Sequence, residues 1–278
     1  MLKQRVITAL VLLAILLPAL FYPSPVPFAL VALLLIAAGG WEWARLNGYG
    51  PLSALGAGAV CVLLCGMSWD LGLLDKPLPL LWRLAGAAWV LLGAWLLRGG
   101  VAGWPRIPRS VRLAGGVLAL WLAWLAVAQA RFMGIEFLLS VLLLVWVADI
   151  GAYFAGKGFG GRFSKSKLAP AISPGKSWEG VWGGMVGVLL LCGVWLLLDS
   201  TGQSLYARLA AQYGPAFTLL SMIFLAAFSV VGDLVESLIK RSAGVKDSSG
   251  LLPGHGGVLD RVDALLPVLP LSMMLLSV

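Results

Sequence analysis

The stretch GDLVESLIKRSAGVKDSSGLLPGHGGVLDRVD runs from Gly232 to Asp263 and interrupts a chain that is apolar almost everywhere else. It carries nine formal charges and His255, the single histidine of the sequence. Apolar runs flank it on both sides, so we expect its charges at a bilayer boundary. Ionisable groups in such a position are costly and usually mark a site. We therefore expect the chemistry of the protein here.

The composition indicates a membrane protein. Of 278 residues, 60% are hydrophobic and only 12% are charged, and the mean hydropathy is +0.96. A soluble protein cannot hide that much apolar surface, and the alternation typical of a membrane β-barrel is absent. We predict an all-α, polytopic integral membrane protein.

On either side of the polar stretch and within it, nine apolar segments match a membrane span of about 20 residues. The first follows MLKQR and resembles a signal peptide, but it lacks a clear cleavage site, so we interpret it as an uncleaved helix. The nine segments are 5–22, 26–46, 52–74, 79–98, 112–130, 135–156, 178–198, 215–240 and 258–278.

The basic residues predict the orientation of the chain. With the N-terminus in the cytoplasm, sixteen of the twenty Lys and Arg residues fall on the inside, as the positive-inside rule requires. The polar loops 157–177 and 241–257 then both face the cytoplasm, and the protein is expected in the inner (plasma) membrane. Because the net charge of +8 is concentrated in loops, we expect no nucleic-acid partner.

We divide the chain into N-terminal transmembrane helices, 1–130, and a C-terminal catalytic region, 131–278. In the first part, WEWAR, from Trp41 to Arg45, is typical of an interfacial belt and favours a structural role. The basic loop around Arg106 and Arg109 most simply fixes topology, with attraction of anionic lipid headgroups as a second role.

The second part contains two further candidate features. Asp149 ends an apolar run and is either functional or a partner in an interhelical hydrogen bond. GKGFGGRFSKSKLAPAISPGKSWEG, from Gly156 to Gly180, combines glycines with cationic side chains, which suits a polyphosphate. Ser173 or Ser177 could cap the helix that begins near Trp178. The alternative is a basic loop that only sets topology.

The polar stretch itself contains a helical pattern of ionisable groups. Asp233, Glu236, Ser237 and Lys240 follow i, i+3, i+4 and i+7 spacing and form one stripe, and Asp260 and Asp263 repeat the i, i+3 spacing. Carboxylates from two helices can hold Mg²⁺, with Lys, Arg and backbone donors for phosphate, as phosphoryl or nucleotidyl transfer requires. The alternative is a purely structural ion network.

Four blocks within this stretch resemble a known signature: Ser237-Leu-Ile-Lys-Arg, Lys246-Asp247, Pro253-Gly-His-Gly-Gly and Asp260-Arg-Val-Asp263. With this spacing the chain is similar to the phosphatidate cytidylyltransferases (CDP-diacylglycerol synthases). KLAPAISPGKSWEG is similar to a second block of that family, in which lysine often occupies the position of Gly175. The first four spans match only in being hydrophobic.

The resemblance implies transfer of a cytidylyl group from CTP to phosphatidate, giving CDP-diacylglycerol and pyrophosphate. It also implies Mg²⁺, with a second cation as a further candidate, and makes a homodimer plausible. Asp233 and Asp260 are the first choices as metal ligands, followed by Asp263 and then Glu236. The implied catalytic residues are Asp233, Lys240, Arg241, Lys246, Asp247, His255, Asp260, Arg261 and Asp263, and the implied substrate-binding residues are Lys167, Ser173, Lys176, Ser177, Glu179 and Ser237.

Two other functions fit parts of the same pattern. One is a phosphotransferase that acts on a polyprenyl phosphate. The other is a secondary transporter, in which Asp149, Asp233 and Asp260 bind ions near the midplane. Their positions at the ends of spans, beside basic loops, argue against a transporter.

Overall fold

The computed structural model describes residues 2–164 and 166–277. Lys165, in the predicted loop 157–177, lies outside the described residues. Eight helices in the described part are long and apolar enough to cross a membrane, which confirms the prediction of an all-α polytopic membrane protein. They are α1 (Leu2–Phe21), α2 (Val26–Leu46), α3 (Pro51–Asp70), α4 (Pro79–Gly103), α5 (Arg109–Met133), α6 (Ile135–Phe159), α7 (Trp178–Leu198) and α8 (Leu205–Ser242).

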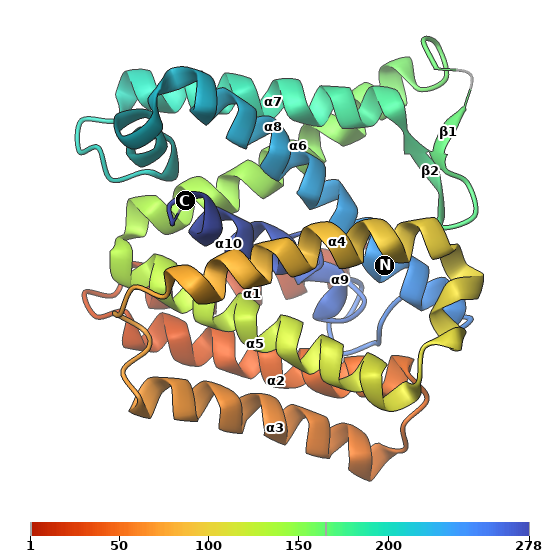
Figure 1. Ribbon diagram of the computed structural model, residues 1–278. Coiled ribbons are helices and arrows are strands. Elements are labelled where there is room, and N and C mark those ends of the chain that lie inside the picture. The colour runs from red at the N-terminus through yellow and green to blue at the C-terminus, as the bar shows by residue number, and fades with distance from the viewer. Residues whose placement is uncertain (1, 165, 278) are drawn as a thin grey trace.

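The ninth predicted span, 258–278, differs from the other eight. It consists of the single turn α9 (Leu259–Val262) and the short helix α10 (Leu265–Leu275). Pro267 has no N–H to donate to the carbonyl of Asp263, which explains the break between them. Most of α10 is buried, and the two termini lie at opposite ends of the bundle (Figure 1). The last segment therefore returns through the interior of the bundle.

Two long helices bend at glycines with positive φ. Gly214 of α8 has a φ of 81° and precedes Pro215, and Gly100 of α4 has a φ of 60° and precedes the short helix η1 (Trp104–Arg106). These bends fall close to the predicted boundaries of the spans 215–240 and 79–98. Glycine is needed at both positions because L side chains rarely adopt this conformation.

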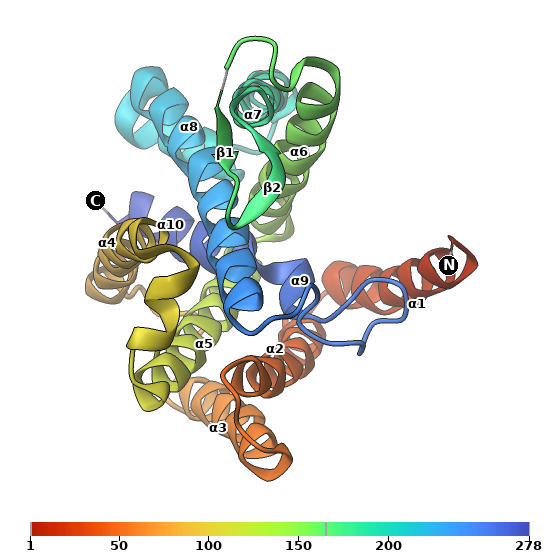
Figure 2. The ribbon, with the colours of Figure 1, turned by 90° about the vertical axis from the view of Figure 1, so that its right-hand side faces the viewer.

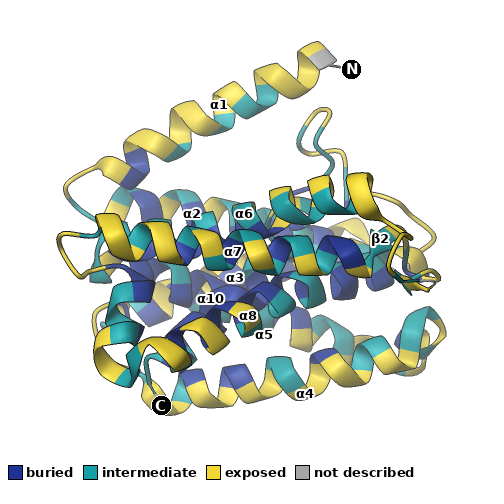
Figure 3. Ribbon diagram, turned by 90° about the horizontal axis from the view of Figure 1, so that it is seen from above, coloured by how far each residue is buried: buried dark blue, intermediate teal, exposed yellow. Residues whose placement is uncertain are grey.

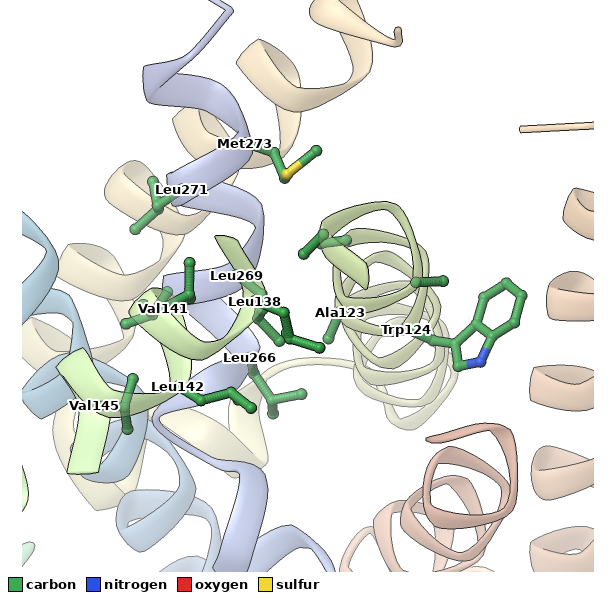
Figure 4. Close-up of a cluster of buried hydrophobic side chains, with 14 of the residues drawn as sticks. Ala123, Trp124, Leu138, Val141, Leu142, Val145, Leu266, Leu269, Leu271 and Met273 are labelled. Atoms are coloured by element: carbon green, nitrogen blue, oxygen red, sulfur yellow. The ribbon is translucent and has the colours of Figure 1, made fainter. Parts of the chain in front are cut away.

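One hydrophobic core joins the two parts of the chain. Ala123 of α5 faces Leu138 of α6 and the residues of α10 (Figure 4), whereas Trp124 points to the opposite side, where its Nε1 donates to the Ala29 carbonyl of α2 at 3.0 Å. Helices α5, α6 and α10 all contribute to one buried cluster. Because this cluster contains residues from both sides of position 130, the parts 1–130 and 131–278 pack as one bundle. The functional division at residue 130 stays a prediction.

A small hairpin occupies the predicted loop 157–177. Strands β1 (Lys167–Ala169) and β2 (Ser173–Ser177) pair antiparallel, with Lys167 opposite Ser177. Ile172 at its turn is buried against Leu234 and Leu238 of α8. The hairpin therefore lies beside the C-terminal half of α8 (Figure 2).

Helix α1 lies at the edge of the bundle, with most of its surface exposed (Figure 3). Its N-terminal half touches the glycine-rich turn after α8. Arg5 Nε donates to the Gly254 carbonyl at 3.0 Å, and Thr8 Oγ1 donates to the Pro253 carbonyl at 2.8 Å. The first helix therefore supports one wall of the polar end of the molecule.

Candidate active site

The polar stripe of α8 begins where this helix packs closely against the last segment. A Cβ atom on Gly232 would lie 2.4 Å from the Asp263 carbonyl oxygen, so only glycine permits this approach. The next residue, Asp233, forms an ion pair with Lys176 of β2, with 2.5 Å between Nζ and Oδ2. Ser237 Oγ donates to its other oxygen at 3.2 Å. The hairpin and α8 thus meet at Asp233.

About two turns further along α8, Lys240 joins two carboxylates. Its Nζ lies 2.5 Å from Glu236 Oε2 and 2.5 Å from Asp260 Oδ1. All three side chains are largely buried, and such pairs hold their geometry because separating the charges would leave them uncompensated. Lys240 therefore fixes α9 against α8.

The second oxygen of Asp260 has a full set of donors. Asp260 Oδ2 accepts from Ser248 N at 2.9 Å, from Ser248 Oγ at 2.9 Å and from Gly257 N at 2.7 Å. Burial alone would raise the pKa of Asp260, but the Lys240 ammonium and the two backbone N–H groups outweigh it, and the pKa lies below its usual value. Asp260 is therefore held as an anion that organises the turn between α8 and α9.

Glu42 is a residue of the site that the sequence reasoning missed. It belongs to WEWAR and is fully buried. Its oxygens accept from Ser249 Oγ at 2.5 Å, Val258 N at 2.9 Å, Leu259 N at 2.8 Å and Ser248 Oγ at 3.1 Å. The sequence feature that could have identified Glu42 is a single carboxylate inside an apolar run. The first half of the chain thus contributes directly to the polar end.

The PGHGG turn owes its shape to its glycines. Gly254 and Gly256 have φ values of 77° and 81°, and a Cβ on Gly257 would lie 2.0 Å from Ser248 Oγ. The His255 carbonyl accepts from Arg261 Nε at 3.0 Å and from Nη2 at 2.7 Å. His255 Nδ1 is buried and has no hydrogen-bond partner among the described residues.

A second set of carboxylates surrounds Asp233. Asp149 of α6 and Asp263 both lie within electrostatic range of Asp233, and Asp149 also lies within range of Lys176. Asp263 Oδ1 accepts from Ala264 N at 2.8 Å. Like charges brought together in this way favour binding of a cation.

The remaining hairpin residues hold the hairpin in place. Lys167 Nζ donates to the Pro174 carbonyl at 2.8 Å. Ser177 is the N-cap of α7, with Oγ accepting from Gly180 N at 3.2 Å, while Ser173 lies at the start of β2. Glu179 is buried and accepts from Phe163 N at 3.0 Å and Ser164 N at 2.7 Å. Of these predicted substrate-binding residues, none bonds to the stripe on α8.

The residues after the stripe are more open to solvent. Arg241 Nε donates to the Ile172 carbonyl of the hairpin and Nη1 to the Val245 carbonyl, both at 3.4 Å. Lys246, Asp247 and Arg261 are exposed. These three side chains are accessible to a ligand from solution.

The three predicted metal ligands are not equivalent. No group of three or more His, Cys, Asp and Glu residues within 2–164 and 166–277 is arranged to hold a metal ion. Because Asp260 already binds Lys240 and three N–H and O–H donors, it fits a metal poorly. Asp233 and Asp263 fit better, since Mg²⁺ is usually bound by one or two carboxylates together with water and substrate phosphates.

Comparison with known proteins gives a consistent result. The model of the family described as "Cytidylyltransferase family" matches residues 3–278. A relative from Pseudomonas aeruginosa, named "Phosphatidate cytidylyltransferase", is 43% identical over 99% of this chain and 97% of its own length. Relatives with the same name from Haemophilus influenzae and Brucella melitensis are 39% and 34% identical over 97% and 95% of this chain, and over 96% and 89% of their own lengths. The chain belongs to the cytidylyltransferase family.

Proposed function

We propose that this protein transfers a cytidylyl group from CTP to phosphatidate, giving CDP-diacylglycerol and pyrophosphate. The observation that carries the proposal is the ion pair between Lys176 and Asp233. It joins the two polar segments that resemble the family's blocks, and relatives of nearly the same length carry the corresponding name.

In this reaction a phosphate oxygen of phosphatidate attacks the α-phosphorus of CTP. A new P–O bond forms, the bond to the β-phosphate oxygen breaks, and pyrophosphate leaves with the electron pair. Phosphatidate is already ionised near neutral pH, so no strong general base is needed. The main task of the site is to offset repulsion between two anionic reactants.

The side chains divide between binding and support. Lys176, Lys246 and Arg261 are the candidates to neutralise phosphates, because they are exposed or partly exposed. Lys240 is occupied by two carboxylates, which supports a positioning role. His255 is better suited to orienting a phosphate than to removing a proton, and its unpaired Nδ1 is consistent with this.

We further propose that Mg²⁺ is held by Asp233 and Asp263, with Asp260 as a positioning residue. When bound there, Mg²⁺ would supply positive charge to the phosphate groups. If Asp233 binds the ion through Oδ2, the ion would displace Lys176 and release a cationic side chain for the incoming triphosphate. A second cation remains part of the proposal.

The location of the site and the assembly of the protein are also proposals. The excess of Lys and Arg at one end supports an inner-membrane protein whose site faces the cytoplasm, where CTP is available. Phosphatidate would enter from the bilayer. A homodimer is proposed from the resemblance alone.

The proposal is tested by release of pyrophosphate from CTP by the purified full-length protein in phosphatidate-containing bilayers with Mg²⁺. Chelation of Mg²⁺ should stop turnover, and Asp233→Asn should reduce it by about 10²–10³-fold, as loss of one electrostatic contact to the transition state does. Asp75→Asn, an exposed carboxylate far along the chain from the stripe, is the control. No pyrophosphate from an intact, reconstituted sample would contradict the proposal, and turnover with a polyprenyl phosphate in place of phosphatidate would redirect it.

A further inference from the structure

A cleft of about 800 Å³ lies beside the candidate active site, on the side of the N-terminal helices. Its walls are the C-terminal end of α2, the start of α5 with η1, and the segment that follows α8. These elements meet at the end of the bundle that carries the hairpin (Figure 2). A cleft of this size falls within the usual range for small-molecule sites, roughly 300–1,000 Å³.

Three guanidinium groups line this cleft, from Arg45, Arg109 and Arg112. Arg109 already donates to the carbonyls of Asn47 and Gly48, which leaves Arg45 and Arg112 as the candidates for a ligand. In the described part of the chain, none of the three forms an ion pair with a carboxylate. Arg45 stacks over Trp41, and Arg112 over Trp104. Asp247 is the single carboxylate among the described lining residues, so the lining has a positive balance.

Two buried polar atoms on the lining residues have no partner among the described residues. They are Nε of Arg112, a donor, and Oδ1 of Asn47, an acceptor. Asn47 is only 3% exposed, and its Nδ2 donates to the Trp43 carbonyl at 2.9 Å. Buried polar groups are normally paired, so unpaired ones indicate a missing partner. Arg112 Nε therefore lacks an acceptor, and Asn47 Oδ1 lacks an N–H or O–H donor.

From this geometry we infer that the cleft binds a phosphate group of a ligand that also carries an N–H or O–H donor. Arginine forks match phosphate oxygens in a bidentate manner, which a surface formed to fix topology does not require. Nucleotides and a protonated lipid phosphate both meet this description. The inference goes beyond the transfer reaction and does not involve Asp233.

One wall of the cleft also belongs to the part of the candidate active site around Asp260 and Glu42. Ser248 lines the cleft and donates to Asp260. The Ser249 hydroxyl donates to Glu42, and the single hydroxyl hydrogen of Ser248 is shared between Glu42 and Asp260. A ligand in the cleft therefore lies one layer of side chains away from Asp260.

The test uses the purified full-length protein and its melting temperature, because a ligand that binds the native state raises it with concentration. The probes are CTP in detergent solution and, separately, mixed micelles with rising fractions of phosphatidate in place of phosphatidylcholine. We expect Arg112→Gln and Arg45→Gln each to weaken the binding of one probe by about tenfold or more, as loss of a charge-assisted contact does. Arg106→Gln removes the same charge from an exposed position in η1 outside the cleft and should stay within about twofold of the native protein.

If the two variants bind only CTP more weakly, the ligand of the cleft is a nucleotide phosphate. If they bind only phosphatidate more weakly, the ligand is a lipid phosphate. Binding of both probes at native strength in both variants would overturn the inference, and so would the absence of any shift in the native protein. If Arg112→Gln fails to fold, the exposed Arg45 still decides the question. Because the readout is binding, loss of this site is distinguishable from failure of the transfer reaction, which is measured as pyrophosphate.

Discussion

Two groups of charged side chains lie at the same end of this molecule and differ in how far their bonding is complete. The closed cluster consists of Glu42, Lys240 and Asp260, with Glu236 attached through Lys240 alone, because Glu236 Oε1 is buried without a partner among the described residues. The open set consists of Asp149, Asp233, Asp263 and Lys176. The side chain of Asp260 is 7% exposed and binds one ammonium and three N–H and O–H donors. That of Asp233 is 34% exposed and binds one ammonium and one hydroxyl.

This difference separates support from reactivity. A buried carboxylate whose oxygens are all occupied holds backbone segments together, and exchanging its partners for a substrate would be costly. A partly exposed carboxylate with few partners can take a new one. Charge at a membrane boundary therefore predicts that a functional site lies at this end of the bundle. The hydrogen bonds then distinguish the side chains that support the site from those that can bind a ligand.

The largest effect is expected where the closed cluster loses its cation. Lys240→Met keeps the length of the side chain but leaves Glu236 and Asp260 without their shared ammonium, which should cost about 3–5 kcal/mol of stability. We expect a large fall in melting temperature in detergent. Lys246→Met makes the same change at an exposed position on the next segment and should leave the melting temperature almost unchanged.

The distinction between the closed cluster and the open set would be contradicted if Lys240→Met kept the melting temperature of the native protein and lost only turnover. It would also fail if Asp233→Asn, in the open set, lowered the melting temperature as much as Lys240→Met does. Measuring melting and pyrophosphate release on the same samples separates these outcomes.

A smaller effect is expected from packing inside the closed cluster. Gly257→Ala places a methyl group 2.0 Å from Ser248 Oγ and 2.4 Å from Glu42 Oε1, so the turn must shift. Overpacking of this kind costs about 1–3 kcal/mol. Gly250→Ala is the matched control on the same segment, because nothing lies within 4 Å of the added atom. Equal melting temperatures for the two variants would show that the cluster is looser than its contacts indicate.

Much of the fold could be predicted because membrane spans are set by the length of apolar runs. The break between α9 and α10 escaped this reasoning, since it depends on Pro267 inside a run that still counts as apolar. The hairpin escaped it as well, because SPGKS has no strand-like alternation and its position depends on Ile172 packing against α8.

The candidate site could be predicted in its residue types but not in its division into two groups. The i, i+3, i+4, i+7 spacing correctly placed the stripe on one helix, and the ion pair of Lys176 with Asp233 joins the two segments that were singled out. The role of Glu42 depends on contacts with residues more than 200 positions away in sequence. Periodicity and local spacing contain no information about such contacts.

The smallest effect is expected at Asp199, which follows α7 and lies outside both groups. It resembles the closed cluster in bonding, since it accepts from Ser204 Oγ at 2.6 Å, Gly202 N at 2.7 Å and Thr201 N at 2.9 Å. The hydrogen bond from Ser204 is the main cause that lowers the pKa of Asp199 to about 2. A carboxyl group with a lowered pKa stabilises the fold when ionised, so its contribution is present above its ordinary pKa of about 4 and is lost as the pH falls towards 2.

Asp199→Asn should therefore lower the melting temperature at pH 7 by about 2–4 °C. The difference from the native protein should shrink as the pH is lowered from 4 towards 2, with Asp75→Asn as the exposed control. A difference that stayed constant over this range would mean that the asparagine changes the shape of the turn and that charge contributes little there. In that case hydrogen-bond number alone could not explain the closed cluster, and burial would have to be the property that separates it from the open set.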